Sequence, residues 1–585
     1  MAEPDRSSRS QNRDVVRHSG TTSIAAALGV ASGLALDVAI AASFGAGTRS
    51  DAFFVAARLP LGITSILMVG ANQAFVPAIS TWLAREPGRR RSRQLVTALV
   101  LATVVIATAV AFAASLLATP LVRLTAPGLD GDAVETASAL ARILFAIVPL
   151  VAAAEVLRAL LNALHSFAAP AMMHVVLNGV AAAIVIGSGG EDVSVVAWAY
   201  VAGAAAQLVF LAGAVVRRRF VPALGASLGD PRIAEAGRLS VRPLVGASLN
   251  PLARVGEQAM ISFLPPGSIT IMNYGYRLIS AIGGSVLFRS VIVVILPRLT
   301  RATADGRDAE VRQLTRLGVQ IMLAVSVPLT AFMAVLAGPA VLAVFRRGNF
   351  SAEDATLLGA VLAVYAASLV GSAVQRALLA PFFARLDTRV PLRNTVYGVA
   401  ANLALVPVLL LPFGDDPYGV IGVAAAYSIA QYVNVAHAWV RLRRETAIRL
   451  PGIGRTALRL AASGLAMAAA MAAVVVALDP EDAPSRVVGL VETAAAGLVG
   501  LAVLAAVGGA LGLLSLGRGL RSVREIPVPS PPRGPEGAVD PSPVGDLAAT
   551  SMPTDAGAER PPPGDAATPI PPDDGGSRGG AGAAS

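Results

Sequence analysis

The amino-acid sequence predicts an all-α, multi-pass membrane protein, and three observations support this fold class. Of the 585 residues, 55% are hydrophobic and only 14% are charged, whereas soluble proteins carry about 25% charged residues. Apolar stretches of the length that crosses a bilayer, about 20 residues, recur along most of the chain. Short arginine-rich segments separate many of these stretches, as is typical of cytoplasmic loops between membrane spans.

Apolar windows predict about 14 transmembrane helices. Their approximate bounds are residues 22–43, 52–83, 95–119, 138–162, 170–188, 194–216, 241–263, 270–297, 315–341, 355–380, 392–412, 418–440, 456–477 and 486–515. Residues 1–20 are polar and arginine-rich, which predicts a cytoplasmic tail rather than a cleaved signal peptide. Residues 518–585 are rich in Pro, Gly, Ala and Asp and predict a disordered cytoplasmic tail.

The charges of the predicted loops indicate the orientation of the helices. Alternate loops are strongly basic, with the residues Arg89, Arg90, Arg91, Arg217, Arg218, Arg219, Arg441, Arg443 and Arg444. Most loops of the other set are acidic, with the residues Asp130, Asp132, Glu191, Asp415, Asp479, Glu481 and Asp482. The positive-inside rule then places both termini in the cytoplasm. Arg346 and Arg347 are an exception, because they fall on the opposite side.

One apolar unit appears twice, each time with an arginine inside the predicted membrane stretch. The copies are DAFFVAARLPLGITSILMVGANQAFVPAIS at 51–80 and IMNYGYRLISAIGGSVLFRSVIVVILPRLT at 271–300. Arg58 and Arg277 occupy matching positions in the copies. Because matching points are about six spans apart, the halves are predicted to be parallel repeats. We expect an N-lobe at 21–219, a linker at 220–240, a C-lobe at 241–445 and two added helices at 446–517.

Basic residues inside the predicted spans are the first candidates for a binding site, because charge in a membrane is expensive and usually functional. Arg58 and Arg277 are predicted to face a central cavity and to bind an anionic group, with Asp51 nearby. Snorkelling toward a membrane interface is the alternative. Arg254 and Glu257 lie three residues apart on one helix face, so they belong either to the site or to a structural ion pair.

Isolated acidic residues inside the spans are the second group of candidates. Asp37 and Glu155 are predicted either to bind a coupling proton or cation or to pair with an arginine such as Arg58, Arg158 or Arg289.

Several function classes are disfavoured by the composition. The chain has no cysteine, and no two histidines have metal-ligand spacing. It has no Gly-Lys-Ser/Thr phosphate loop and no arrangement of catalytic side chains that stands out. We therefore expect no metal, no cofactor and no catalytic residue, and a transporter rather than an enzyme. Membrane topology explains the net charge of +10 better than nucleic-acid binding does.

The segment GAGTRSDAFFVAARLP at 45–60, followed by QAFVP at 73–77, resembles the MurJ (MviN) family of lipid II flippases. This family is part of the multidrug/oligosaccharidyl-lipid/polysaccharide exporter superfamily. Further matches follow in order, namely LTAPGL at 124–129, LNALHSFAAPA at 161–171, YGYRL at 274–278, ILPRL at 295–299 and FRRGNFSAEDA at 345–355. The resemblance covers roughly residues 22–445.

The resemblance implies two helix bundles around a cationic cavity that opens alternately to each side of the bacterial plasma membrane. It also implies a groove for the lipid tail in the last two helices, and a substrate such as an undecaprenyl-pyrophosphate-linked sugar. Arginine suits a pyrophosphate, because its planar fork donates paired, charge-assisted hydrogen bonds. Asp51 and Arg277 match the family, whereas Val30, Leu36 and the Thr64–Ser65 step stand where family members carry arginines.

The favoured hypothesis is a flippase that moves a peptidoglycan precursor from the inner to the outer leaflet by alternating access. A cation-coupled exporter of small amphiphiles is an alternative, although it would not need two added helices. A transport-inactive paralogue that acts as a cell-wall scaffold is another, favoured by the missing arginines and by the tail, which could recruit cell-wall synthesis proteins. Arg277 and the repeat oppose this last hypothesis. The sugar and the coupling ion stay open.

Overall fold

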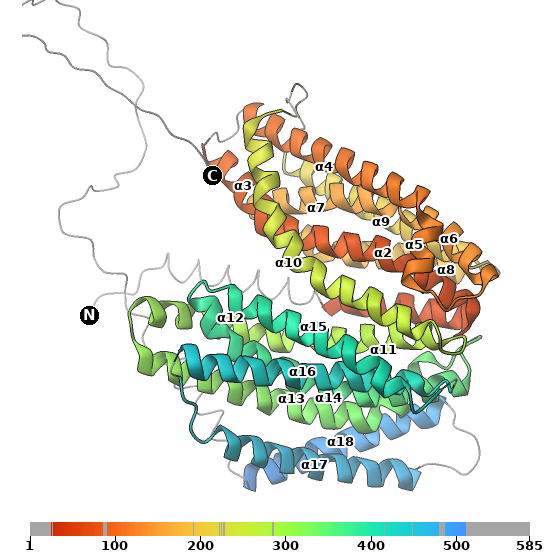
Figure 1. Cartoon of the computed structure of the whole chain (residues 1–585), viewed down its shortest axis with the longest axis vertical. Helices are drawn as coiled ribbons and strands as arrows, with labels where there is room; N and C mark the ends of the chain where they lie inside the picture. The colour runs from red at the N-terminus through yellow and green to blue at the C-terminus, as the bar shows by residue number, and fades with distance from the viewer. Residues whose placement is uncertain are drawn as a thin grey trace, which may run out of the picture. The chain divides into compact units, whose positions relative to one another are not determined.

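The computed structural model describes residues 25, 27–85, 90–190, 192–220, 223, 225, 229–283, 286–414, 416–446, 448–478 and 486–510. The predicted tails at 1–20 and 518–585, together with Arg89, Glu191, Asp415 and residues 479–482, lie outside this part of the chain. Every regular element within it is helical (Figure 1), which confirms the all-α fold class.

Twelve of the described helical segments are long and apolar enough to cross a membrane. They are Ala27–Phe44, Thr48–Arg85, Arg90–Leu116, Gly131–Ala163, Ala168–Gly187, Ser194–Arg217, Asp308–Phe345, Ala352–Ala384, Arg389–Leu410, Gly419–Glu445, Ile453–Leu478 and Val487–Gly509. Each overlaps one predicted span, so the chain is a multi-pass membrane protein. The predicted spans 241–263 and 270–297 overlap helices that do not meet this standard, so the count of 14 stays a prediction.

The first half of the structure consists of the helix Ala27–Phe44 and of the helices that precede residue 218. These are α2 (Thr48–Gly70), η1 (Ala71–Phe75), α3 (Val76–Arg85), α4 (Arg90–Leu116), α5 (Ala118–Thr125), α6 (Gly131–Leu144), α7 (Ile147–Ala163), α8 (Ala168–Gly187) and α9 (Ser194–Arg217). Helix α7 packs against α2, α4 and α9, and α8 packs against α9. Small residues allow this close approach: a Cβ atom on Gly203 would lie 2.5 Å from the carbonyl oxygen of Leu177.

The second half is built around α14 and is followed by two further helices. It contains α10 (Pro231–Ile261), α11 (Ser268–Gly283), α12 (Val286–Ala304), α13 (Asp308–Phe345), α14 (Ala352–Ala384), α15 (Arg389–Leu410) and α16 (Gly419–Glu445). Helix α14 packs against α11, α13 and α16. The last helices, α17 (Ile453–Leu478) and α18 (Arg486–Ala510), pack on each other and on α13 (Figure 1).

The predicted span 270–297 overlaps two described helical segments, α11 and α12, and residues 284 and 285 between them lie outside the described part of the chain. In the matching copy, α2 continues through the π-helical turn η1 into α3. A π-helical turn therefore follows Arg58 in the first copy.

The two halves contact each other along α10 and through their connecting segments. Helix α10 packs against α2 and η1 of the first half and against α15 of the second (Figure 1). The backbone N–H of Asn349 donates to the carbonyl oxygen of Ala42 at 2.8 Å. The backbone N–H of Gly128 donates to the hydroxyl of Ser262 at 2.9 Å. All four residues lie in or beside turns between helices, so the halves are joined at one end of the helices.

Candidate functional site

Arg277 of α11 forms an ion pair across the two halves of the structure. Its guanidinium pairs with the carboxylate of Asp37, which lies on the helix Ala27–Phe44. It also donates weakly to the hydroxyl of Tyr200 on α9, at 3.3 and 3.4 Å. The side chain of Arg277 is 30% exposed, whereas that of Asp37 is only 8% exposed. The arginine therefore reaches an open space while its partner is buried.

That space is a cavity of about 550 Å³, here called the Arg277 cavity. Its lining comes from both halves and includes Asp37, Leu61, Met68, Glu155, His174, Asn178, Tyr200, Tyr276, Arg277 and Ser280. Val30, Leu36, Thr64 and Ser65 also line it. Since family resemblance places arginines at these positions, the cavity is less cationic than that resemblance implies.

Glu155 of α7 lines the same cavity but already has a cationic partner. It pairs with Arg158 one helical turn away, which is one of the pairings that the sequence left open. Arg158 also donates to Asn72 at 2.7 Å and to the backbone carbonyl of Met68 at 3.1 Å. Both acceptors lie in or beside the π-helical turn η1. Asp37, by contrast, pairs with Arg277, which sequence reasoning did not consider as its partner.

Arg58 lies in a different environment from its sequence twin. Its Nε donates to Gln258 at 2.7 Å and its Nη2 donates to Asn273 at 2.9 Å. None of the ion pairs found in the described residues includes Arg58. The adjoining cavity is about 20 Å³, which is room for roughly one water molecule. Arg58 is thus held by neutral amides of the second half, with no space beside it for a large ligand.

Arg254 and Glu257 of α10 form the ion pair that their spacing predicts, at 2.5 Å. The guanidinium carbon of Arg254 lies 3.2 Å from the ring centroid of Tyr276 and 4.8 Å from that of Tyr427. Glu257 also accepts a hydrogen bond from the side-chain amide of Asn402. Glu257 is buried and the side chain of Arg254 is only 13% exposed, so ion pairing and cation–π contact together offset the loss of hydration.

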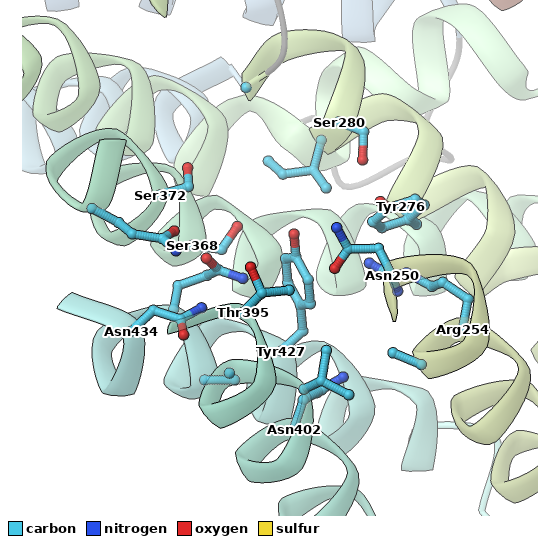
Figure 2. Close-up of a pocket in the computed structure, with 18 of the residues that line it drawn as sticks. Asn250, Arg254, Tyr276, Ser280, Ser368, Ser372, Thr395, Asn402, Tyr427 and Asn434 are labelled. Carbon is cyan, nitrogen blue, oxygen red and sulfur yellow. The ribbon is translucent and has the colours of Figure 1, made fainter. Parts of the chain in front are cut away.

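This pair borders a second cavity of about 370 Å³, here called the amide cavity. Figure 2 shows its side chains converging from α10, α11, α14, α15 and α16. Most are polar and uncharged, and they include Asn250, Ser280, Ser368, Ser372, Gln375, Thr395, Asn402, Gln431 and Asn434. Tyr276 and Ser280 line both cavities. Helix α11 is therefore a wall shared by the two cavities.

Asp51 lies at neither of these cavities and instead holds the N-terminus of α11. Its carboxylate accepts hydrogen bonds from the backbone N–H groups of Gly267 and Thr270, both at 2.7 Å, and from the Thr270 hydroxyl at 2.6 Å. A carboxylate in this position satisfies exposed helix N–H groups and complements the helix dipole. The contact anchors α2 to α11 across the two halves.

The predicted site residues therefore separate into groups. Arg277, Asp37 and Glu155 line the Arg277 cavity. Arg58, Arg254 and Glu257 gather around the small cavity between α2, α10 and α11. Sequence reasoning did not single out Tyr200, Asn402, Tyr427 or Asn434. A signal was present, because α15 and α16 are the two least apolar of the twelve described spans.

Comparisons with known proteins identify the family of the chain. The family model described as "Lipid II flippase MurJ" matches residues 40–484. A protein of Rhizobium meliloti (strain 1021), named "Probable lipid II flippase MurJ", is 30% identical over 416 residues, which are 68% of this chain and 74% of that protein.

Two solved structures share the fold. "Lipid II flippase MurJ, inward closed conformation" has a TM-score of 0.70 at 18% identity, covering 84% of this chain and 99% of that one. An inward-facing multidrug resistance MATE family transporter of the MOP superfamily has a TM-score of 0.60 at 16% identity, covering 70% and 94%. With a family model that spans most of the sequence, the chain belongs to the MurJ family.

Proposed function

We propose that this chain moves a lipid-linked oligosaccharide, most simply the peptidoglycan precursor lipid II, from the inner to the outer leaflet of the bacterial plasma membrane. The observation that carries the proposal is membership of the MurJ family, whose model covers residues 40–484. The predicted substrate contains a pyrophosphate, and the partly exposed guanidinium of Arg277, at a cavity of about 550 Å³, is suited to that group.

Binding of a pyrophosphate at Arg277 has a consequence for the two halves. Arg277 and Asp37 link α11 to the helix Ala27–Phe44 through an ion pair. An anionic head group that takes over the guanidinium N–H donors would compete with Asp37 and weaken that link. A ligand shifts a conformational equilibrium only when it binds the two states differently. Competition with Asp37 supplies such a difference, and it supports alternating access without requiring an ion to bind Asp37 or Glu155.

The orientation of this state follows from the loop charges. If the basic loops face the cytoplasm, the end joined by Asn349, Ala42 and Ser262 faces outward. The lining of the Arg277 cavity runs from Asp37 toward Val30 and from Leu61 toward Met68, and both runs lead away from the joined end. The cavity would then be accessible from the cytoplasm. Helices α17 and α18, packed on α13, are our candidates for the lipid-tail groove.

A transport-inactive scaffold is the second candidate, and one observation favours it. Val30, Leu36, Thr64 and Ser65 line the Arg277 cavity without charge, so the cavity is poorer in phosphate-binding groups than the family resemblance implies. In that case the tail at 518–585 would be the part that acts, by recruiting cell-wall synthesis proteins.

The test is complementation of a bacterium depleted of its own lipid II flippase. We expect the full chain to restore growth and the appearance of precursor on the outer leaflet, and Arg277→Ala to abolish both. Arg307→Ala is the matched control, because Arg307 pairs with Asp305 and Glu310 in partly exposed ion pairs. Failure of the unaltered chain to rescue, while it is present in the membrane, would refute lipid II transport and favour the scaffold.

A further inference from the structure

The amide cavity has no assigned role in the transport step described above. It is enclosed by helices of the second half alone, whereas the Arg277 cavity is lined by both halves. The two cavities meet at α11, where Tyr276 and Ser280 line both. Its volume of about 370 Å³ lies within the range of small-molecule sites, about 300–1,000 Å³.

Two buried amide oxygens at the wall of this cavity lack a hydrogen-bond donor. Asn402 and Asn434 line the cavity and are 5% and 6% exposed, and their shielded Oδ1 atoms accept no hydrogen bond from the described residues. The orientation of Asn402 is fixed, because its amide N–H group donates to Glu257. Its oxygen is therefore the unpartnered atom, and a buried acceptor without a donor is unfavourable.

The charged residues around the cavity disfavour a metal cation as its ligand. The carboxylate Glu257 is already neutralised by Arg254 and hydrogen-bonded by Asn402. A second arginine, Arg376, also lines the cavity. The remaining polar groups are amides and hydroxyls, as Figure 2 shows for Asn250, Ser368, Ser372 and Thr395. Such a lining matches an uncharged ligand that has many hydroxyl or amide N–H groups.

We propose, on the basis of the function proposed above, that the amide cavity binds the uncharged sugar part of the head group while Arg277 binds its phosphate part. The shared wall α11 places the two contacts on neighbouring residues, Tyr276 and Arg277. The sugar then determines specificity through Asn402 and Asn434, and the pyrophosphate supplies the charge that every substrate of this class carries. The cavity lies within one half, so the sugar contacts persist when the halves move apart.

The test measures binding of two synthetic lipids to the purified full chain in nanodiscs. Both carry the same polyprenyl pyrophosphate, and one also carries a disaccharide. We expect the disaccharide lipid to bind more tightly. Asn434→Leu should weaken its binding about threefold to tenfold, the effect of losing one neutral hydrogen bond. The same variant should leave binding of the sugar-free lipid unchanged.

A second variant disturbs the amide of Asn434 without replacing it. A Cβ atom on Gly398 would lie 2.3 Å from the side-chain nitrogen of Asn434, so Gly398→Ala must displace that amide and should reproduce the selective loss. Gly213→Ala is the matched control, because a Cβ atom there meets no atom within 4 Å. Melting temperatures of all variants establish that they fold.

The outcomes separate this inference from the function on which it rests. Equal binding of the two lipids to the unaltered chain would overturn the sugar site alone, as would an equal effect of both variants on both lipids. Absence of binding for both lipids would overturn the proposed function and the sugar site together. Arg277→Ala should weaken both lipids equally, which identifies the phosphate contact independently.

Discussion

The two cavities on either side of α11 use charge in opposite ways. In the Arg277 cavity the ion pair of Arg277 with Asp37 joins residues 240 positions apart, on different halves. At the amide cavity the ion pair of Arg254 with Glu257 lies within one turn of α10. In the proposed alternating access, the pair of Arg277 with Asp37 breaks when the halves separate, whereas Arg254 and Glu257 move together on α10. One of these two ion pairs therefore links the halves, and the other lies within a single half.

The uncharged residues that line the two cavities also differ in polarity. The Arg277 cavity contains apolar residues such as Val30, Leu34, Leu36 and Leu61, while the amide cavity is mostly polar. Hydrophobic walls around an arginine strengthen its attraction for a phosphate, because the local dielectric constant is low. Amides and hydroxyls instead discriminate between ligands by hydrogen bonding. If both proposals hold, the Arg277 cavity supplies affinity for the phosphate and the amide cavity supplies selectivity for the sugar.

The largest expected effect is a loss of stability when the ion pair of Arg254 with Glu257 is broken. Glu257→Ala leaves the guanidinium of Arg254 buried without its counter-charge, and such a loss destabilises a protein by about 3–5 kcal/mol. Thermal unfolding of the purified chain in detergent should show a markedly lower midpoint. Glu445→Ala is the matched control, because Glu445 pairs with Arg441 at a site where both side chains are about one-third exposed.

A second substitution establishes whether the uncompensated charge is the cause. The double variant with Arg254→Met and Glu257→Leu should recover part of the lost stability, since apolar groups often replace a buried pair without penalty. If it is less stable than the single variant, the role of Glu257 is not to neutralise Arg254.

The next largest effect is expected when the ion pair of Arg277 with Asp37, which links the halves, is removed. Asp37→Asn removes the charge that competes for Arg277, so affinity for a polyprenyl pyrophosphate lipid should rise about tenfold, equivalent to roughly 1.4 kcal/mol. Transport should fall, because the two halves lose the contact that the empty protein re-forms. Binding and precursor translocation are measured on the same variant, with Asp305→Asn as a surface control. A parallel loss of both would mean that Asp37 positions Arg277 instead of competing for it.

Sequence reasoning predicted the fold class and the charged residues of the candidate site, and the physical reasons can be named. A helix in lipid must be apolar over about 20 residues, so twelve of the predicted spans coincide with described helices that meet this standard. Helix α10 falls below it because polar and charged residues such as Asn250, Arg254 and Glu257 interrupt its apolar run. The described part of α11 has 16 residues, which is shorter than a membrane span. Charged residues such as Arg277 and Glu257 stand out in the sequence, because an unpaired charge in a membrane is rarely tolerated.

The low hydropathy of α15 and α16 indicates polar positions in these helices, but it does not identify the individual site residues. Asn402 and Asn434 are neutral amides, which membrane helices accommodate at modest expense, so neither stands out among apolar neighbours. The partners of the charges depend on tertiary structure. Asp37 meets Arg277, and Asp51 meets Gly267 and Thr270 more than 200 residues away. No local spacing specifies such pairs, whereas the spacing of Arg254 and Glu257 does.

The smallest expected effect is a gain in ligand affinity when a positive charge is added to the Arg277 cavity. Thr64 lines the Arg277 cavity at one of the positions where an arginine is expected from the family resemblance. Thr64→Arg should raise affinity for the pyrophosphate lipid about threefold, because a partly exposed charge contributes only about 0.5–1 kcal/mol. The gain should decline with added salt. It should be the same for the sugar-free and the disaccharide lipid, because phosphate is common to both. Thr356→Arg, on an exposed position of α14, controls for general electrostatic attraction. A gain restricted to the disaccharide lipid would place the sugar, and not the phosphate, beside Arg277, and would reverse the assignment of the two cavities.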